Sequence, residues 1–276
     1  MNWKRTNRYG AGQSSGRNDD TSKDMMDGDE PEGHEPSDSS TPTTDLMGVS
    51  HLPEGMALEI TRVEPGKRRE RGRYMIHFGQ HILSVLEDVM IKYRMTKGAT
   101  FTKADLEEIV LADEKQQAYI HALRTLARKP RTQMEITQRL LQKDIAPDII
   151  EETLIRLGSE KLIDDELYAR QWVQQRISQQ YKGKLWVRQE LQQKGIAKHT
   201  IAEALAEIED DLELDSALAA GMKKWRQTRG DMRDRRNKTY AYLLRRGFSS
   251  EIVRGVLKQI LEHEEASLDE DEYDGV

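Results

Sequence analysis

Hydrophobic positions in the second half of the chain follow a helical period that repeats as a larger unit. From residue 113 onward, Gly or Pro interrupts the helical pattern about every 10–18 residues. Three similar segments, 140–145, 191–196 and 243–248, lie 51 to 52 residues apart. An apolar trio follows each one, namely Ile150/Leu154/Leu157, Ile201/Leu205/Ile208 and Val253/Leu257/Ile260. A longer helix is predicted before each, over 114–128, 166–180 and 212–229. The pattern predicts three tandem three-helix units.

The repeated segment has the chemistry of a helix end followed by a new helix. Lys or Arg occupies the last turn, where a cation meets the negative end of the helix dipole. Gly195 and Gly247 then suit the left-handed position after the helix, and an Ile or Phe packs back onto it. In the first segment Asp144 replaces Gly, which is acceptable because Asp tolerates the left-handed region better than most residues. We expect repeat 1 over 113–164, repeat 2 over 165–211 and repeat 3 over 212–263, stacked as an elongated, curved array.

Residues 56–112 have a different, partly alternating pattern. Residues 58–63 alternate apolar and polar as in a half-buried strand, and Pro65-Gly66 then breaks the run. Two further strands are predicted over 74–78 and 82–86, joined by Gly79-Gln80, with helices over 87–95 and 102–111. The basic segment 67–73 is interpreted as a polar hairpin tip. This part is therefore predicted to be a small α+β module.

The two ends of the chain are acidic and poor in apolar residues. Residues 1–55 show no sustained period, and 27–42 contain no aliphatic side chain. The segment 264–276 carries seven acidic residues and no Lys or Arg. Neither end can bury enough apolar surface to offset its conformational entropy. We expect a disordered acidic N-terminal arm over 1–55 and a disordered acidic tail over 264–276.

The net charge of −6 conceals a basic middle. Residues 1–55 sum to −6, residues 56–262 to +7 and residues 263–276 to −7. Between Lys223 and Lys258 there are 12 basic residues and only three acidic ones. Such a body favours a polyanionic partner, nucleic acid or an acidic protein surface. A solvated helical face is the alternative interpretation.

Particular residues in this pattern resemble the RecX family, regulators of the RecA recombinase. The resemblance is carried by 162–170 (Leu-Ile-Asp-Asp-Glu-Leu-Tyr-Ala-Arg), by 188–196 (Arg-Gln-Glu-Leu-Gln-Gln-Lys-Gly-Ile) and by 244–248 (Leu-Arg-Arg-Gly-Phe). It covers about residues 56–262, including an N-terminal module like that of longer family members. It implies a negative regulator of recombination and DNA repair in the SOS response. Such a protein binds the RecA–DNA filament and restrains strand exchange, ATP hydrolysis and filament growth. The acidic ends and Asp144 depart from the family pattern.

Motifs typical of enzymes and metal proteins are missing from the sequence. It has no Cys, no HExxH, no phosphate-binding Gly-rich loop and no Ser nucleophile elbow. The Asp164-Asp165-Glu166 cluster is interpreted as helix capping rather than as a metal or acid/base site. No apolar run is long enough to span a bilayer, and no secretory signal is present. We expect a soluble cytoplasmic protein without catalytic activity, cofactor or metal.

Basic residues near the turns of repeats 2 and 3 form the candidate RecA- and DNA-binding site. They are predicted to form one stripe, in which each cation that meets a phosphate releases counterions. Trp172, Tyr168 and Trp225 are expected in the core, whereas Trp186 is either a core residue or an exposed stacking residue. The predicted site comprises Arg176, Lys182, Lys184, Trp186, Arg188, Arg229, Arg233, Arg235, Arg236, Lys238, Arg245 and Arg246.

Two other functions remain compatible with the sequence. One is a generic DNA-binding protein that inserts a single helix–turn–helix-like unit into a groove. The other is an α-helical protein-interaction scaffold that makes no contact with DNA. In the preferred interpretation the chain is a monomer that binds the RecA filament and, more weakly, single- or double-stranded DNA. Binding to single-stranded, duplex and RecA-coated DNA distinguishes the three.

Overall fold

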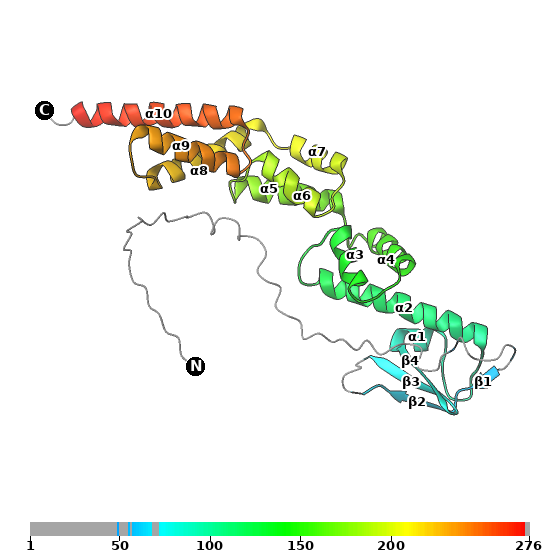
Figure 1. Cartoon of the computed structure of the whole chain (residues 1–276). Helices are drawn as coiled ribbons and strands as arrows, with labels where there is room; N and C mark the ends of the chain where they lie inside the picture. Colours follow the sequence, from blue (N-terminus) through cyan, green and yellow to red (C-terminus); the bar gives the residue numbers. More distant parts are fainter. Residues whose placement is uncertain (1–48, 50–54, 56, 68–71, 274–276) are drawn as a thin grey trace, which may run out of the picture. The chain divides into compact units, whose positions relative to one another are not determined.

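A computed structural model of the chain describes residues 49, 55, 57–67 and 72–273 (Figure 1). The chain divides into two units, residues 1–43 and 44–276, and every described residue belongs to the second. Of the arm expected over 1–55, all but Val49 and Gly55 lies outside the described residues. The described part contains ten helices and five short strands, so the mainly α fold class with a small strand-containing module is confirmed.

The N-terminal module contains two small antiparallel sheets. One has the strand order β2-β3-β4 and the other pairs β1 with β5. The strand expected over 58–63 is in fact two strands, because the chain changes partner after Ile60, whose N–H donates to the carbonyl of Ala99 at 2.8 Å. β5 was not predicted, since three residues carry too little pattern to be recognised. The elements are β1 (Ala57–Glu59), β2 (Arg62–Pro65), β3 (Arg73–Phe78), β4 (His81–Leu86), α1 (Glu87–Lys92) and β5 (Thr100–Thr102).

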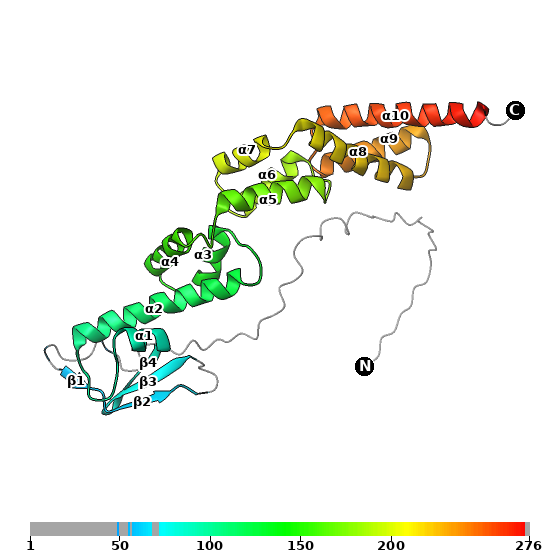
Figure 2. The same cartoon turned by 180° about the vertical axis from the view of Figure 1, so that it is seen from behind.

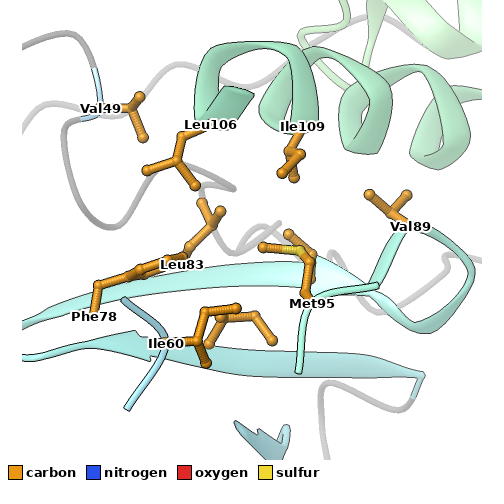
Figure 3. Packing of buried hydrophobic residues seen from close by; sticks show 10 residues of the cluster. Val49, Ile60, Phe78, Leu83, Val89, Met95, Leu106 and Ile109 are labelled. Carbon is orange, nitrogen blue, oxygen red and sulfur yellow. The ribbon is translucent and has the colours of Figure 1, made fainter. Parts of the chain in front are cut away.

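A compact apolar core lies between the sheets and the helix that covers them. Ile76 and Leu83 face each other in the β3–β4 register, and Leu106 and Ile109 pack against this core from the helix above (Figure 3). Val49 also belongs to the core and is only 2% exposed. The boundary expected at residue 55 is therefore too late, because Val49 contributes a buried side chain to the module.

One helix joins the module to the first repeat. α2 (Lys103–Leu126) is continuous through the boundary expected between residues 112 and 113. No Gly or Pro interrupts it there, and Asp113 is fully buried. Asp113 accepts hydrogen bonds from Arg73 at 2.8 Å and from the N–H of Leu86 at 2.6 Å. Arg73 was expected in a polar hairpin tip, but it is a buried strand residue that pairs with α2; residues 68–71 lie outside the described residues.

Three tandem three-helix repeats follow, as the sequence predicts (Figures 1 and 2). Each has its own apolar cluster, and every predicted trio contributes to it, although Leu154 is only partly buried. Repeat 1 uses the second half of α2 as its first helix. The remaining helices are α3 (Gln133–Leu141), α4 (Pro147–Ser159), α5 (Asp165–Ser178), α6 (Lys184–Gln193), α7 (Lys198–Ala206), α8 (Asp210–Gln227), α9 (Met232–Arg245) and α10 (Ser250–Tyr273).

The turn between the second and third helix of each repeat has the predicted left-handed residue. The backbone angle φ is +57° at Asp144, +78° at Gly195 and +83° at Gly247. In each turn the next residue donates its N–H to a carbonyl five residues earlier: Ile145 to Leu140, Ile196 to Leu191 and Phe248 to Leu243. This six-to-one hydrogen bond is the hallmark of a Schellman helix end.

The last helix continues past the expected end of repeat 3. α10 extends to Tyr273, so the start of a disordered tail at residue 264 is wrong for Glu264. Glu264 is half-buried and accepts hydrogen bonds from Arg235 and from the indole N–H of Trp225. These contacts hold the acidic residue on the repeat, and composition alone gives no sign of them. Residues 274–276 lie outside the described residues.

Candidate nucleic-acid interface

The same kind of joint links each repeat to the next. The residue that precedes the second helix of one repeat docks on the left-handed turn of the following repeat. Thr132 donates its hydroxyl to the carbonyl of Lys194 at 2.8 Å, and Gly183 donates its N–H to the carbonyl of Arg246 at 2.8 Å. Leu185 adds a hydrogen bond to the carbonyl of Gly247 at 3.1 Å. We call this arrangement the inter-repeat joint.

The joint gives the two turn glycines a second reason to lack a side chain. A Cβ at Gly195 would lie 2.2 Å from Met134 Sδ, and one at Gly247 would lie 2.4 Å from the backbone nitrogen of Trp186. The departure at Asp144 now has a physical explanation. No three-helix repeat precedes repeat 1 among the described residues, so nothing docks on that turn and Asp144 is exposed.

A carboxylate completes each joint, half-buried at Asp165 and buried at Glu213. Asp165 accepts the N–H of Gln133 at 3.0 Å, and Glu213 accepts the N–H of Lys184 at 2.8 Å. Each satisfies an amide that a helix start would otherwise leave without a partner. Burial raises the pKa of both carboxyl groups above their usual values.

Stacked aromatic and cationic side chains line the joint between repeats 1 and 2. The rings of Tyr168 and Trp172 stack with centroids 5.4 Å apart, and the ammonium of Lys194 lies 4.6 Å from the Trp172 ring. Lys194 also pairs with Glu135 across the joint at 2.9 Å. Tyr168 and Trp172 were expected in the core; both are half-buried and pack against the apolar cluster of repeat 2, at its edge.

Arg176 was predicted to contact DNA, but its side chain is only 6% exposed. Its guanidinium lies 4.1 Å from the centre of the Trp172 ring and pairs with Glu190 at 3.0 Å. It also donates to Gln180. An arginine so enclosed stabilises repeat 2 and cannot reach a phosphate without disrupting these contacts, so this assignment is corrected.

Three further predicted site residues are engaged at the joint between repeats 2 and 3. Lys184 donates to the carbonyl of Ile208 at 3.0 Å and pairs with Asp210 at 2.9 Å. Arg246 donates to the carbonyl of Gln180 at 2.7 Å. Lys182 is half-buried, with its ammonium 4.2 Å from the Trp186 ring.

Trp186 fits neither of the two roles that the sequence left open. It is half-buried, so it is neither a core residue nor a free stacking platform. Its backbone and Cβ approach Gly247 instead. Trp186 is thus a component of the joint between repeats 2 and 3. Trp225, by contrast, is 1% exposed and confirms its predicted core position.

The Arg235 side chain is also engaged in contacts within repeat 3. Its guanidinium lies 4.3 Å from the centre of the Trp225 ring and pairs with Glu264 of α10. Burial tends to raise the pKa of Glu264, but hydrogen bonds from Arg235 and Trp225 hold it below its usual value. The carboxylate therefore stays charged and keeps Arg235 on the repeat.

The other six predicted site residues are exposed. Lys238 makes an ion pair with Asp234 at 3.8 Å. The remaining five have no ion-pair partner among the described residues, and four of them lie in repeat 3. The exposed residues are Arg188, Arg229, Arg233, Arg236, Lys238 and Arg245. We call Arg229, Arg233 and Arg236, which lie just before α9 and in its first turns, the α9 basic surface.

The predicted stripe along repeats 2 and 3 is therefore largely confined to repeat 3. The turn before α6 is covered by repeat 3, because Gly183 and Gln180 bond to Arg246. The equivalent turn before α9 is open, since the described chain contains no fourth repeat to cover it. Sequence reasoning also missed exposed cations on neighbouring helices, although they lie in the basic run that it identified: Lys223, Arg226, Arg254 and Lys258.

The acidic cluster at the start of α5 has the capping role that the sequence favoured. Asp164 accepts the N–H of Leu167 at 2.9 Å, the bond expected of a residue that precedes a helix. Within the described residues, no group of three or more His, Asp or Glu side chains is placed to hold a metal ion. None of the described helices is long and apolar enough to cross a membrane.

Comparisons with known proteins agree with the repeat architecture. Family models for the first, second and third three-helix domains of RecX match residues 118–157, 164–205 and 211–257. A regulatory protein RecX of Limosilactobacillus reuteri is 30% identical over 205 residues, which cover 74% of this chain and 77% of the relative. One of Levilactobacillus brevis is 33% identical over 216 residues, 77% of this chain and 79% of the relative. A crystal structure of regulatory protein RecX has a TM-score of 0.59 and 31% identity, and the match covers 72% of this chain and 98% of that one.

Proposed function

We propose, since the chain belongs to the RecX family of regulatory proteins, that it binds the RecA–DNA filament through the α9 basic surface and restrains recombination. Binding would oppose strand exchange, ATP hydrolysis and filament growth. The single observation that carries the proposal is the set of exposed arginines at the start of α9, which have no ion-pair partner among the described residues.

The chemistry of this surface suits a phosphate backbone. A guanidinium offers two parallel N–H donors to a phosphate and stays charged at every physiological pH. Arg233 and Arg236 are three residues apart on α9, so their side chains emerge from neighbouring positions on one helical face. Arg229 lies just before the helix. The inter-repeat joint holds the turn after α9 against repeat 2, so the helix that carries Arg233 and Arg236 is fixed at its other end.

The test compares binding to single-stranded DNA, duplex DNA and RecA-coated DNA at several salt concentrations. Replacing Arg229, Arg233 and Arg236 with Gln removes three charges and keeps side chains that suit a helix. A matched control replaces Lys97, Arg124 and Lys198, which are exposed cations in the N-terminal module, repeat 1 and repeat 2.

We expect wild-type protein to prefer coated DNA and to inhibit strand exchange. The α9 variant should lose about two to three units of slope in a log–log plot of affinity against salt, because each phosphate contact contributes roughly 0.7–0.9. The control should lose much less. Equal loss in both variants would show that overall charge drives binding. Sequence-selective duplex binding would favour a generic DNA-binding protein instead. Failure to bind any of the three DNA substrates would favour a protein-interaction scaffold.

A further inference from the structure

The last helix of repeat 3 differs from its counterparts in the other repeats. α4 has 13 residues and α7 has 9, whereas α10 has 24. Among the described side chains of α10, Ile260 is the last buried apolar residue and Leu261 packs partly against the core, so 12 of the 24 residues follow the part that builds the core. Figures 1 and 2 both show this end of α10 projecting past the connection between α8 and α9. Repeat packing alone does not require this extension.

The extension is strongly acidic. Residues 262–273 contain Glu262, Glu264, Glu265, Asp269, Glu270, Asp271 and Glu272, with no Lys or Arg. Carboxylates at the C-terminal end of a helix oppose its dipole, and adjacent carboxylates repel one another. The sequence therefore retains a local arrangement that weakens the helix, and nearby positive charge would offset the cost.

The described residues supply that positive charge. α10 packs against both α8 and α9. Glu264 pairs with Arg235 of α9 and accepts the indole N–H of Trp225 of α8. In the sequence, Arg233 and Arg236 of the α9 basic surface lie on either side of Arg235. The first part of the acidic extension is thus already bound to the helix that carries the proposed site.

We propose that the acidic end of α10 is an internal competitor whose negative charge opposes the binding of DNA phosphates to the α9 basic surface. This inference rests on the proposed function in one respect, namely that the α9 basic surface binds DNA phosphates. The pairing of Glu264 with Arg235 anchors the base of the competitor. Asp269 to Glu272 follow Glu264 by five to eight residues on the same helix, so they add negative charge about 8–12 Å further along the helix axis. The competitor weakens DNA binding most at low salt, where a charge acts over the longest distance.

The test neutralises the distal carboxylates without shortening the helix. The tail variant carries Asp269→Asn, Glu270→Gln, Asp271→Asn and Glu272→Gln. A matched control removes four exposed acidic charges elsewhere on the repeats, with the changes Glu151→Gln, Glu166→Gln, Glu203→Gln and Asp215→Asn. Affinity for a fluorescent single-stranded oligonucleotide and for RecA-coated DNA is measured at low and high salt.

The tail variant should bind the oligonucleotide roughly threefold to tenfold more tightly than wild type at ~50 mM salt, and the gain should vanish near ~0.5 M salt. The control should gain much less. Adding the changes Arg229→Gln, Arg233→Gln and Arg236→Gln to the tail variant should abolish the gain, because the positive charge on which the competitor acts is then gone. An equal gain in tail variant and control, or a gain that survives loss of the arginines, would overturn the inference.

The two proposals fail in different ways. If wild-type protein prefers coated DNA but the tail variant matches the control, the competitor inference is wrong and the proposed function stands. If the tail variant gains affinity for the oligonucleotide but neither protein prefers coated DNA, the proposed function is wrong. The competitor would then regulate a general DNA-binding surface.

Discussion

The joint between repeats 2 and 3 makes a prediction in which two physical effects can be separated. Gly247 combines a φ of +83° with a close approach, since an added Cβ would lie 2.4 Å from the backbone nitrogen of Trp186. Gly247→Ala must therefore adopt a strained backbone and also open the joint. Gly98 and Gly183 each isolate one of these two effects.

Gly98 has a φ of +88° and nothing within 4 Å of an added Cβ. Gly98→Ala should therefore lose only the backbone term, about 1–2 kcal/mol of unfolding free energy. Gly183 has an ordinary φ of −80°, but an added Cβ would lie 2.2 Å from the carbonyl oxygen of Gly247. Gly183→Ala should lose only the joint, whose two backbone hydrogen bonds contribute about 0.5–1.5 kcal/mol each.

Gly247→Ala should lose both terms, about 2–5 kcal/mol in total. Urea unfolding followed by tryptophan fluorescence measures all three variants. The double variant Gly183→Ala/Gly247→Ala should be less destabilised than the sum of the single changes, because both open the same joint. If Gly247→Ala is no worse than Gly98→Ala, or if Gly183→Ala is neutral, the joint does not hold the repeats together as described.

Three other predictions concern buried groups. Asp113→Ala leaves the buried Arg73 without its ion-pair partner and should destabilise the module by about 3–5 kcal/mol in chemical denaturation, whereas replacing both residues with apolar ones should be less harmful. Because burial raises the pKa of Glu213, the folded protein binds the proton of this carboxyl group more tightly than the unfolded chain does. Its contribution to stability should therefore decline as the pH rises from the unfolded pKa to the folded one, and Glu213→Gln should remove that decline in unfolding curves recorded across this range. Val49→Ala should lower the unfolding free energy of the module by about 1–3 kcal/mol, and a neutral result would show that Val49 does not belong to the core.

The sequence predicts best those features that depend on neighbouring residues. The left-handed turns at Gly195 and Gly247 follow from a cation, a glycine and an apolar residue in succession, and the structure confirms both. The capping role of Asp164 is equally local. Strand β5 is the counterexample, because its pairing with β1 involves residues more than 40 positions apart and only three residues in each strand.

The candidate site was harder to predict because charge along a sequence does not reveal which cations are already paired. Arg176 and Arg233 look alike in the sequence, yet one is enclosed by Trp172 and Glu190 and the other is exposed. Trp172 is four positions from Arg176, but Glu190 is 14 positions away on the next helix, and such a pairing is not visible in a run of charges. The order of the repeats explains why exposed arginines gather at the start of α9, because no further repeat covers this last turn among the described residues.

The inter-repeat joint is directional, and this gives the array two unlike ends. Each repeat offers a helix start on one side and a left-handed turn on the other, so the final helix start is unused at Asp231 and the first turn is unused at Asp144. A head-to-tail contact of this kind between copies would be heterologous and could propagate into an open filament. A carboxylate occupies both unused positions, so two copies brought end to end would place like charges together. The same residue type that departs from the turn pattern at Asp144 would thus also disfavour a head-to-tail contact between copies.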